Sequence, residues 1–151
     1  MLKIRVAEKS DAPLLTANNC AMALETENRV LDPQAAKLGV EGLFARPQFG
    51  FYIVAEVDGI AAASLMVTYE WSDWRNGLFW WIQSVYVKSD FRRQGLYRSM
   101  YKELKAMAAA QETPVCGFRL YAETDNHKAQ ATYNNCGMHA CDYIMFEQTG
   151  V

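Results

Sequence analysis

A glycine and three arginines lie close together at the predicted start of a helix. Residues 83–87 read Gln-Ser-Val-Tyr-Val, as a strand would, and residues 92–98 read Arg-Arg-Gln-Gly-Leu-Tyr-Arg. A strand that leads through a glycine-containing loop into a helix directs backbone N–H groups and the positive helix end toward one point, where phosphate groups bind. Gly95 would let a phosphate approach the backbone, and charge would come from Arg92, Arg93 and Arg98. The alternative is a solvated basic helix start with no ligand.

A second group of chemically useful side chains lies on and beside one predicted hairpin. Five aromatic residues gather there: Tyr69, Trp71, Trp74, Trp80 and Trp81. With the neighbouring Glu70 and Asp73, they could bind a cationic amine. Such tryptophans more often belong to a core or a dimer interface. Trp80 and Trp81 are adjacent and must face opposite sides of a strand, so we expect only one or two of the five to contact a bound amine.

The elements that position these residues fall into two halves. In the first half, alternating apolar residues predict strands over 2–6, 51–57, 60–69 and 78–87. The last of these is almost continuously apolar, as a central strand covered on both faces would be. Helices are expected after Ser10-Asp11-Ala12-Pro13 and after Asp32-Pro33, with a polar break at residues 25–29 between them. Asp58-Gly59 predicts a tight turn.

The second half alternates strands and helices. An apolar stripe predicts a helix from Leu96 to Met107, and strands are expected over 118–122 and 144–147. Between these strands, Asp125-Asn126 would cap a helix that runs through Cys136, with Gly137 after its end. The resulting order is β-α-α-β-β-β-α-β-α-β, an α+β fold. The crossover from the strand at 78–87 to the strand at 118–122 should be parallel and right-handed.

Bulk properties predict a single domain over residues 1–151. The chain is 51% hydrophobic and 21% charged, and its net charge of −2 argues against broad nucleic-acid or anionic-membrane binding. No apolar stretch approaches a membrane-spanning length, and the N-terminus does not resemble a signal peptide, so we expect a cytoplasmic protein. The four cysteines form no C-x-x-C pair and there are only two histidines, so the spacing typical of a zinc site is absent and we expect no metal.

The loop at residues 92–97 resembles motif A of the Gcn5-related N-acetyltransferase (GNAT) superfamily, Q/R-x-x-G-x-G/A, with Arg92 and Gly95 in the matching positions. Residues 126–138 are similar to the family's N-x-x-A-x-x-x-Y-x-x-x-G-F. The sequence departs from motif A at Tyr97, where glycine or alanine is usual, so this ring should point away from the phosphate or reshape the site. Within the superfamily, residues 23–27 and 69–77 look like those of an uncharacterised bacterial subgroup.

The resemblance implies a largely antiparallel mixed sheet of six to seven strands flanked by about four helices. It also implies acetyl-CoA as the acyl donor. The family's fourth strand bonds the pantetheine amides through its backbone. The donor-binding residues would therefore be Val85, Tyr86, Val87, Arg92, Arg93, Gln94, Gly95, Leu96, Tyr97, Arg98 and Asn126.

The resemblance further implies direct attack by a bound amine on the thioester, through a tetrahedral intermediate. Tyr133 stands where the family places a tyrosine beside the sulfur, and its phenol could protonate the departing thiolate. The alternative role for Tyr133 is a core aromatic of its helix. Asn126 would bond the pantetheine arm, and a backbone N–H of the fourth strand would polarise the thioester carbonyl.

Several residues could be the base that accepts the proton of the amine. Gln83 occupies the position where some relatives carry a glutamate, and an amide cannot act as that base. Glu25 and Glu27, expected on the loop between the first two helices, are the best replacements, and Glu70 is a third candidate. A water chain to any of them is also compatible with the sequence. Equally, Glu25 and Glu27 could be surface charges or helix caps.

Three functions fit these residues. The first is acetylation of a small-molecule primary amine, with the acceptor bound by Glu70, Trp71, Trp81 and Gln83. The second is acetylation of a protein lysine or N-terminus, which would need an open groove. The third is CoA binding without catalysis. The resemblance also implies a possible homodimer, since members of the family often pair through sheet edges or exposed aromatic residues.

Overall fold

The computed structural model describes residues 1–150, and the chain divides into two compact units. The first unit spans residues 1–121 and contains a complete sheet with three long helices. The second unit begins at Ala122 and contains one helix and the C-terminal segment. No helix among the described residues is long and apolar enough to cross a membrane.

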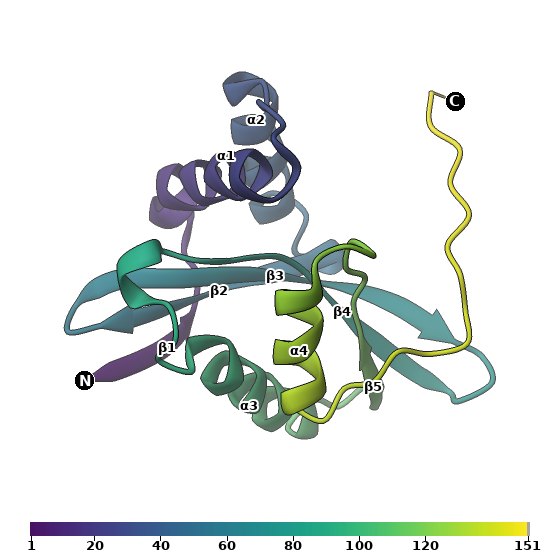
Figure 1. The fold of residues 1–151 in the computed structure, drawn as a ribbon. Coiled ribbons are helices and arrows are strands. Elements are labelled where there is room, and N and C mark those ends of the chain that lie inside the picture. Colours follow the sequence, from purple (N-terminus) through teal and green to yellow (C-terminus); the bar gives the residue numbers. More distant parts are fainter. Residues whose placement is uncertain (151) are drawn as a thin grey trace. The chain divides into compact units, whose positions relative to one another are not determined.

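The first unit is organised by one sheet of five strands in the order β1-β2-β3-β4-β5 (Figure 1). The strands are β1 (Leu2–Val6), β2 (Gly50–Val57), β3 (Ile60–Ser72), β4 (Gly77–Val87) and β5 (Val115–Arg119). The first four pair antiparallel, and β5 pairs parallel to β4. The predicted turn at Asp58-Gly59 joins β2 and β3, with φ of 50° and 82° at its two residues. Such left-handed pairs match the twist of a hairpin.

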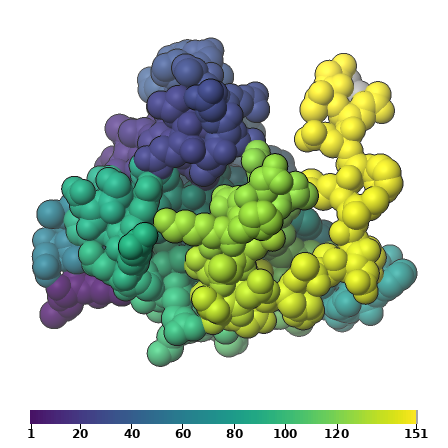
Figure 2. All heavy atoms as spheres, in the orientation of Figure 1, coloured from purple at the N-terminus to yellow at the C-terminus, as the bar shows by residue number. Residues whose placement is uncertain are grey.

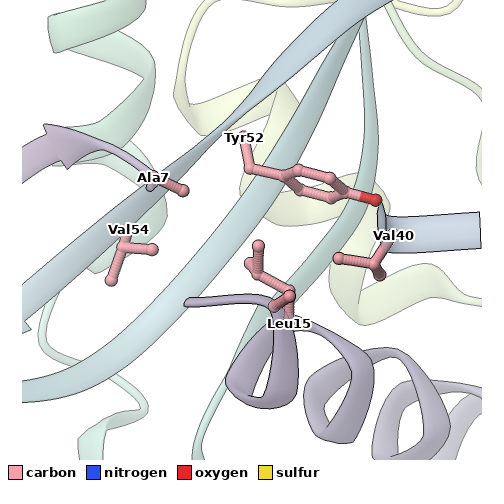
Figure 3. Packing of buried hydrophobic residues seen from close by; sticks show 6 residues of the cluster. Ala7, Leu15, Val40, Tyr52 and Val54 are labelled. Carbon is pink, nitrogen blue, oxygen red and sulfur yellow. The ribbon is translucent and has the colours of Figure 1, made fainter. Parts of the chain in front are cut away.

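Helices α1 (Ala12–Glu27) and α2 (Pro33–Phe44) cover one face of this sheet. Leu15 of α1 and Val40 of α2 approach Tyr52 of β2, and Figure 3 shows the three side chains converging. A buried polar contact adds to this packing, because the Asn18 side-chain amide donates to the Ser64 hydroxyl of β3 at 2.9 Å. This contact anchors α1 over the centre of the sheet.

Helix α3 (Leu96–Ala109) lies on the opposite face and connects β4 to β5 (Figure 1). Met100 and Leu104 of its apolar stripe are fully buried. The ring of Phe118 in β5 makes edge contacts with Trp80 at 6.0 Å and with Tyr101 at 5.3 Å between ring centroids. An aromatic layer therefore covers β4 on this face. The sequence predicted cover on both faces of β4, but most of its outer half, from Gln83 to Val87, is only partly buried.

In the second unit, α4 (His127–Asn135) begins where the capping signal predicts. The Asn126 side-chain oxygen accepts a hydrogen bond from the Ala129 N–H at 3.1 Å, as an N-cap does. Gly137 follows the helix with φ of 89°. Beyond it, residues 138–150 form no helix or strand, and residues 139–150 are all exposed.

Three details of the sequence prediction are corrected. The strand expected at 144–147 does not form, because no neighbouring strand pairs with it among the described residues, so the sheet has five strands rather than six to seven. The strand expected at 118–122 is Val115–Arg119. Finally, α1 continues to Glu27, so Glu25 and Glu27 lie in its last turn instead of on a loop.

We predict that Asn18→Ala lowers the free energy of unfolding by about 1–3 kcal/mol, because it leaves the buried Ser64 hydroxyl without this donor. The matched control is Asn134→Ala at an exposed position of α4, which should change the free energy by less than about 0.5 kcal/mol. Urea unfolding followed by circular dichroism measures both. Equal effects of the two substitutions would contradict a structural role for the buried contact.

Candidate donor and acceptor site

The outer half of β4 has a backbone edge that no strand covers. Pairing between β4 and β5 ends at Trp81 opposite Arg119, where β5 stops, although β4 continues to Val87. From Ile82 onward, the described part of the chain offers no strand on this side of β4. Backbone N–H and C=O groups along such an edge can bond the amide groups of an extended ligand.

A β-bulge in β4 lies within the same stretch. Gln83 pairs with Met66 and Tyr86 with Ser64, so three steps along β4 match two steps along β3. Ser84 accommodates the extra residue with a left-handed φ of 53°. Bulges of this kind turn backbone groups out of the regular ladder and occur beside active sites. No turn residue marks this bulge in the sequence, so sequence reasoning missed Ser84.

The loop after β4 leads into the N-terminus of α3, and its backbone conformation there suits the binding of an anion. Gly95 is the N-cap of α3 with φ of 73°, and Arg93 is also left-handed with φ of 63°. Leu96 and Tyr97 bury their side chains, and the Tyr97 ring stacks on Tyr101 at 6.1 Å. The unusual Tyr97 of the motif therefore directs its ring into the α3 layer, while Arg93 and Arg98 are exposed.

Arg92 is held by contacts within the protein. Its Nε donates to the Val87 carbonyl at 2.8 Å, and its Nη2 lies 2.8 Å from Oε2 of Glu25. The guanidinium also lies over the Tyr86 ring, and the Tyr86 hydroxyl donates to Oε1 of Glu25 at 3.2 Å. Burial, with Glu25 adding to it, raises the pKa of Tyr86, so this hydroxyl remains a donor at neutral pH. The three side chains join the end of α1 to the end of β4.

The sheet face under α1 and α2 carries a polar floor formed by Thr68, Glu70, Trp81, Gln83 and Arg119. Glu70 is its centre: Arg119 donates to both of its oxygens at 3.1 and 2.9 Å, and the Trp81 indole N–H donates to Oε1 at 2.7 Å. The Gln83 amide donates to Thr68 at 3.2 Å. The Arg119 guanidinium also stacks over the ring of Phe79 at 3.6 Å.

Three of the four predicted acceptor residues therefore come together. Glu70, Trp81 and Gln83 share the polar floor, whereas Trp71 follows Glu70 in β3, projects from the opposite face and is half exposed. Trp80 is buried in the aromatic layer, which confirms that it and Trp81 face opposite sides. Sequence reasoning missed Arg119, because a single arginine ending a short strand gave no signal.

Two of the predicted site residues belong to the second unit. Asn126 caps α4, and Tyr133 lies in that helix. Burial raises the pKa of the Tyr133 phenol above its ordinary value of 10.0, so the hydroxyl is protonated at neutral pH. The hydroxyl can therefore donate a proton but cannot serve as a base there.

The described residues contain no cluster of histidine, cysteine or acidic side chains that could hold a metal ion. Two shallow cavities lie elsewhere in the first unit. One of about 200 Å³ lies against α3 and is lined by Phe51, Tyr69 and Trp80 among others, and one of about 300 Å³ borders residues 29–36. Neither is lined by a residue of the polar floor, whose five side chains are partly buried.

A family model described as the acetyltransferase (GNAT) family matches residues 19–138. This match covers most of the chain, and the protein therefore belongs to that family of acetyltransferases. The match includes both β4 with its following loop and α4. No curated protein sequence matches the chain.

Solved structures show the same fold. A possible acetyltransferase from Clostridium difficile 630 is 39% identical, with a TM-score of 0.91, and the alignment covers 100% of this chain and 99% of that one. A predicted acetyltransferase with acetyl-CoA from Clostridium acetobutylicum is 16% identical over 98% of this chain and 96% of that one, with a TM-score of 0.79. AAC(6′)-Iy in complex with a bisubstrate analogue is 12% identical, with a TM-score of 0.78. The alignment covers 100% of this chain and 99% of that one.

Acetyl-CoA is the acyl donor of this family, and the first unit fits it. The donor contains amide groups, which suit the uncovered edge of β4, and a pyrophosphate, which suits a helix N-terminus. A Cβ added at Gly95 would meet no protein atom within 4 Å, so the space in front of this backbone is open. The adjacent Arg93 and Arg98 add positive charge.

We predict that Gly95→Ala weakens acetyl-CoA binding about tenfold, which corresponds to about 1.4 kcal/mol. The added methyl group occupies the open space before the loop, and the left-handed φ of 73° strains any residue with a side chain. The control is Gly39→Ala in α2, where the new Cβ also meets no atom and φ is ordinary. Isothermal titration with acetyl-CoA measures both, and unchanged affinity in Gly95→Ala would place the phosphates elsewhere.

Proposed function

We propose that this protein transfers the acetyl group of acetyl-CoA to a primary amine, and that the acceptor is a small molecule. The observation that carries this proposal is the juxtaposition within the first unit of an uncovered, bulged β4 edge and the left-handed loop at Gly95. The two features suit the pantetheine and pyrophosphate of one extended donor. Residues 1–151 would act as a single catalytic domain.

The reaction we propose is a direct transfer. The acceptor nitrogen, once neutral, forms a bond to the acetyl carbon and the carbon–sulfur bond of the thioester breaks. A proton leaves the nitrogen, and the thiolate takes up a proton to leave as the thiol. A backbone N–H of the β4 bulge near Val85 would polarise the thioester carbonyl, because the ladder with β3 is interrupted there.

We propose Tyr133 as the acid that protonates the thiolate. Its raised pKa supports this role, because the phenol keeps its proton at neutral pH. Asn126, at the N-cap of the same helix, would contact the pantetheine arm. Both roles follow from the positions of these residues in the family motif.

The two glutamates at the end of α1 receive different proposed roles. Glu25 forms an ion pair with Arg92 and accepts a hydrogen bond from Tyr86. We therefore propose that Glu25, through Arg92, positions the loop at residues 92–95, which we call the donor loop. Glu27, two residues further and exposed, is then the better candidate to accept the proton of the amine, directly or through water. Glu70 is already engaged by Arg119 and Trp81.

The acceptor would bind over the polar floor. Its indole, amide and hydroxyl groups favour a polar amine, and the aromatic surface of Trp81, close to the Tyr121 ring at 6.2 Å, offers a flat contact for its carbon skeleton. Acetylation of a protein lysine or N-terminus remains the alternative within the same chemistry. A panel of small amines and lysine peptides, assayed by release of free CoA, separates the two.

We predict that Tyr133→Phe lowers kcat by about 10²–10⁴-fold while the affinity for acetyl-CoA changes little, because only the proton donor is lost. Any alkaline decline of kcat caused by Tyr133 should lie above pH 10.0, since its pKa is raised, and should vanish in the variant. Tyr143→Phe, in the exposed C-terminal segment, is the control. If the wild-type protein binds acetyl-CoA but turns over with no amine, it is a non-catalytic CoA-binding protein and the proposal fails.

We predict that Glu25→Gln and Glu27→Gln separate positioning from proton transfer. Glu25→Gln should raise KM for acetyl-CoA several-fold, on the order of 1 kcal/mol or less for a half-exposed ion pair, with the pH dependence of kcat unchanged. Glu27→Gln should leave KM unchanged and lower kcat, and it should remove the fall of kcat toward acid pH that a protonated base causes. Steady-state kinetics across pH 5–9 would measure both, and an exchange of the two phenotypes would reverse the assigned roles.

A further inference from the structure

One aromatic ring near the start of β4 is in contact with two guanidinium groups. Phe79 is buried, and a Cβ added at Gly117 of β5 would lie only 2.6 Å from its ring, so the ring packs directly on the backbone of β5. The Arg119 guanidinium lies over this ring at 3.6 Å from the centroid, and the Arg75 guanidinium lies over it at 5.2 Å. Cation–π contacts of this kind hold both positive groups beside one fixed ring.

The two arginines differ in how their charge is balanced. Arg119 belongs to the polar floor and forms an ion pair with Glu70 at 2.9 Å. Arg75 is exposed in the turn between β3 and β4, and it forms no ion pair within residues 1–150. Asp73, in the same turn, is also exposed and forms no ion pair within that range. The contacts around Phe79 therefore join two guanidinium groups to a single carboxylate, which leaves one excess positive charge.

This excess charge lies at one end of the face over which we propose that the acceptor binds. Phe79, Trp81 and Gln83 share one face of β4, because side chains alternate along a strand. Phe79 and Gln83 are four residues apart, or about 13 Å in an extended strand. Arg75 reaches this face from the end of the β3–β4 hairpin, which Figure 2 shows in teal at the molecular surface. The polar floor thus lies between a positive group and the bulged part of β4.

We infer that the acceptor carries a carboxylate as well as its amine, and that Arg75 binds this carboxylate. The inference rests on the proposed transfer to a small amine and names the class of that amine. It is an elongated amino acid whose amine and carboxylate lie at opposite ends, on the order of 13 Å apart. Its chain would lie along Trp81, and the planar guanidinium of Arg75 can donate two parallel hydrogen bonds to the carboxylate.

The excess charge favours a carboxylate over a phosphate ester. One carboxylate carries one negative charge and balances the excess positive charge. A phosphate monoester carries about −1.5 to −2 at neutral pH and would leave the group of charges negative. Amines without an acidic group, including polyamines, would meet the positive charge of Arg75 without any compensating contact.

The test compares acceptors in pairs of equal chain length. The long pair is 8-aminooctanoate with octylamine, and the short pair is 4-aminobutanoate with butylamine, whose members cannot span the floor. We expect kcat/KM for 8-aminooctanoate to exceed that for octylamine about fivefold, as an exposed ion pair would give, and we expect no such preference in the short pair. Release of free CoA measures the rate with all four compounds.

Substitutions of Arg75 test the carboxylate contact directly. Arg75→Gln should reduce the ratio of the two kcat/KM values to about one, because the amide carries no charge, whereas Arg75→Lys should retain part of the preference. The matched control is Arg46→Gln, which removes an exposed arginine just after α2 and should retain the full preference. Raising the salt concentration to about 1 M should also weaken the preference of the wild-type protein, because salt screens an exposed ion pair.

Failure of this inference can be told apart from failure of the proposed function. If octylamine is acetylated and 8-aminooctanoate is no better, or if the preference persists in Arg75→Gln, the carboxylate site is overturned and the acetyl transfer stands. If no amine is acetylated, the proposed function fails, and isothermal titration of 8-aminooctanoate into the protein with CoA decides the carboxylate site. Binding that is tighter in the wild type than in Arg75→Gln would support the site, and equal binding would overturn it.

Discussion

The site depends on one constraint on β4: its two edges must behave differently along the same strand. One edge pairs with β3 over nearly its whole length, whereas the other pairs with β5 only as far as Trp81. A parallel neighbour makes this possible, because β5 enters the sheet from the α3 crossover and ends early at Arg119. The same crossover brings the start of α3 to the end of β4, next to the edge that β5 leaves uncovered. The uncovered edge of β4 and the nearby start of α3, which we propose bind the amides and phosphates of the donor, are thus two consequences of one topology.

Two of the ion pairs of the first unit lie near this edge. Arg92 with Glu25 lies at the end of β4, and Arg119 with Glu70 lies where β5 stops. Each pair joins different parts of the unit, the first linking α1 to the donor loop and the second linking β3 to β5. Both are partly exposed, so each contributes little to stability, and their main effect is to orient side chains and set the local charge. Arg93 and Arg98 are exposed near Gly95, where we propose that the phosphates bind.

The sequence predicted most of the architecture because the signals were local. Apolar alternation, the Asp58-Gly59 turn and the Asn126 cap each depend on a few neighbouring residues, and the structure confirms them. The conformation of residues 144–147 could not be predicted from local signals, because a strand also needs a neighbouring strand to pair with. The same limit hid the bulge at Ser84, which exists only relative to β3, and the role of Arg119, which depends on the register between β3, β4 and β5.

In the acceptor site that we propose, the contacts of Glu70 indicate why an acidic residue need not be the base. An isolated carboxylate would favour the protonated form of a bound amine and raise its pKa. A protonated amine has no lone pair with which to attack the thioester, so strong binding through an isolated carboxylate would oppose the reaction. Here Arg119 compensates the charge of Glu70, and Trp81 satisfies one of its oxygens. The floor is consequently close to neutral, so an amine bound there, as we propose, would not be stabilised in the unreactive ammonium form.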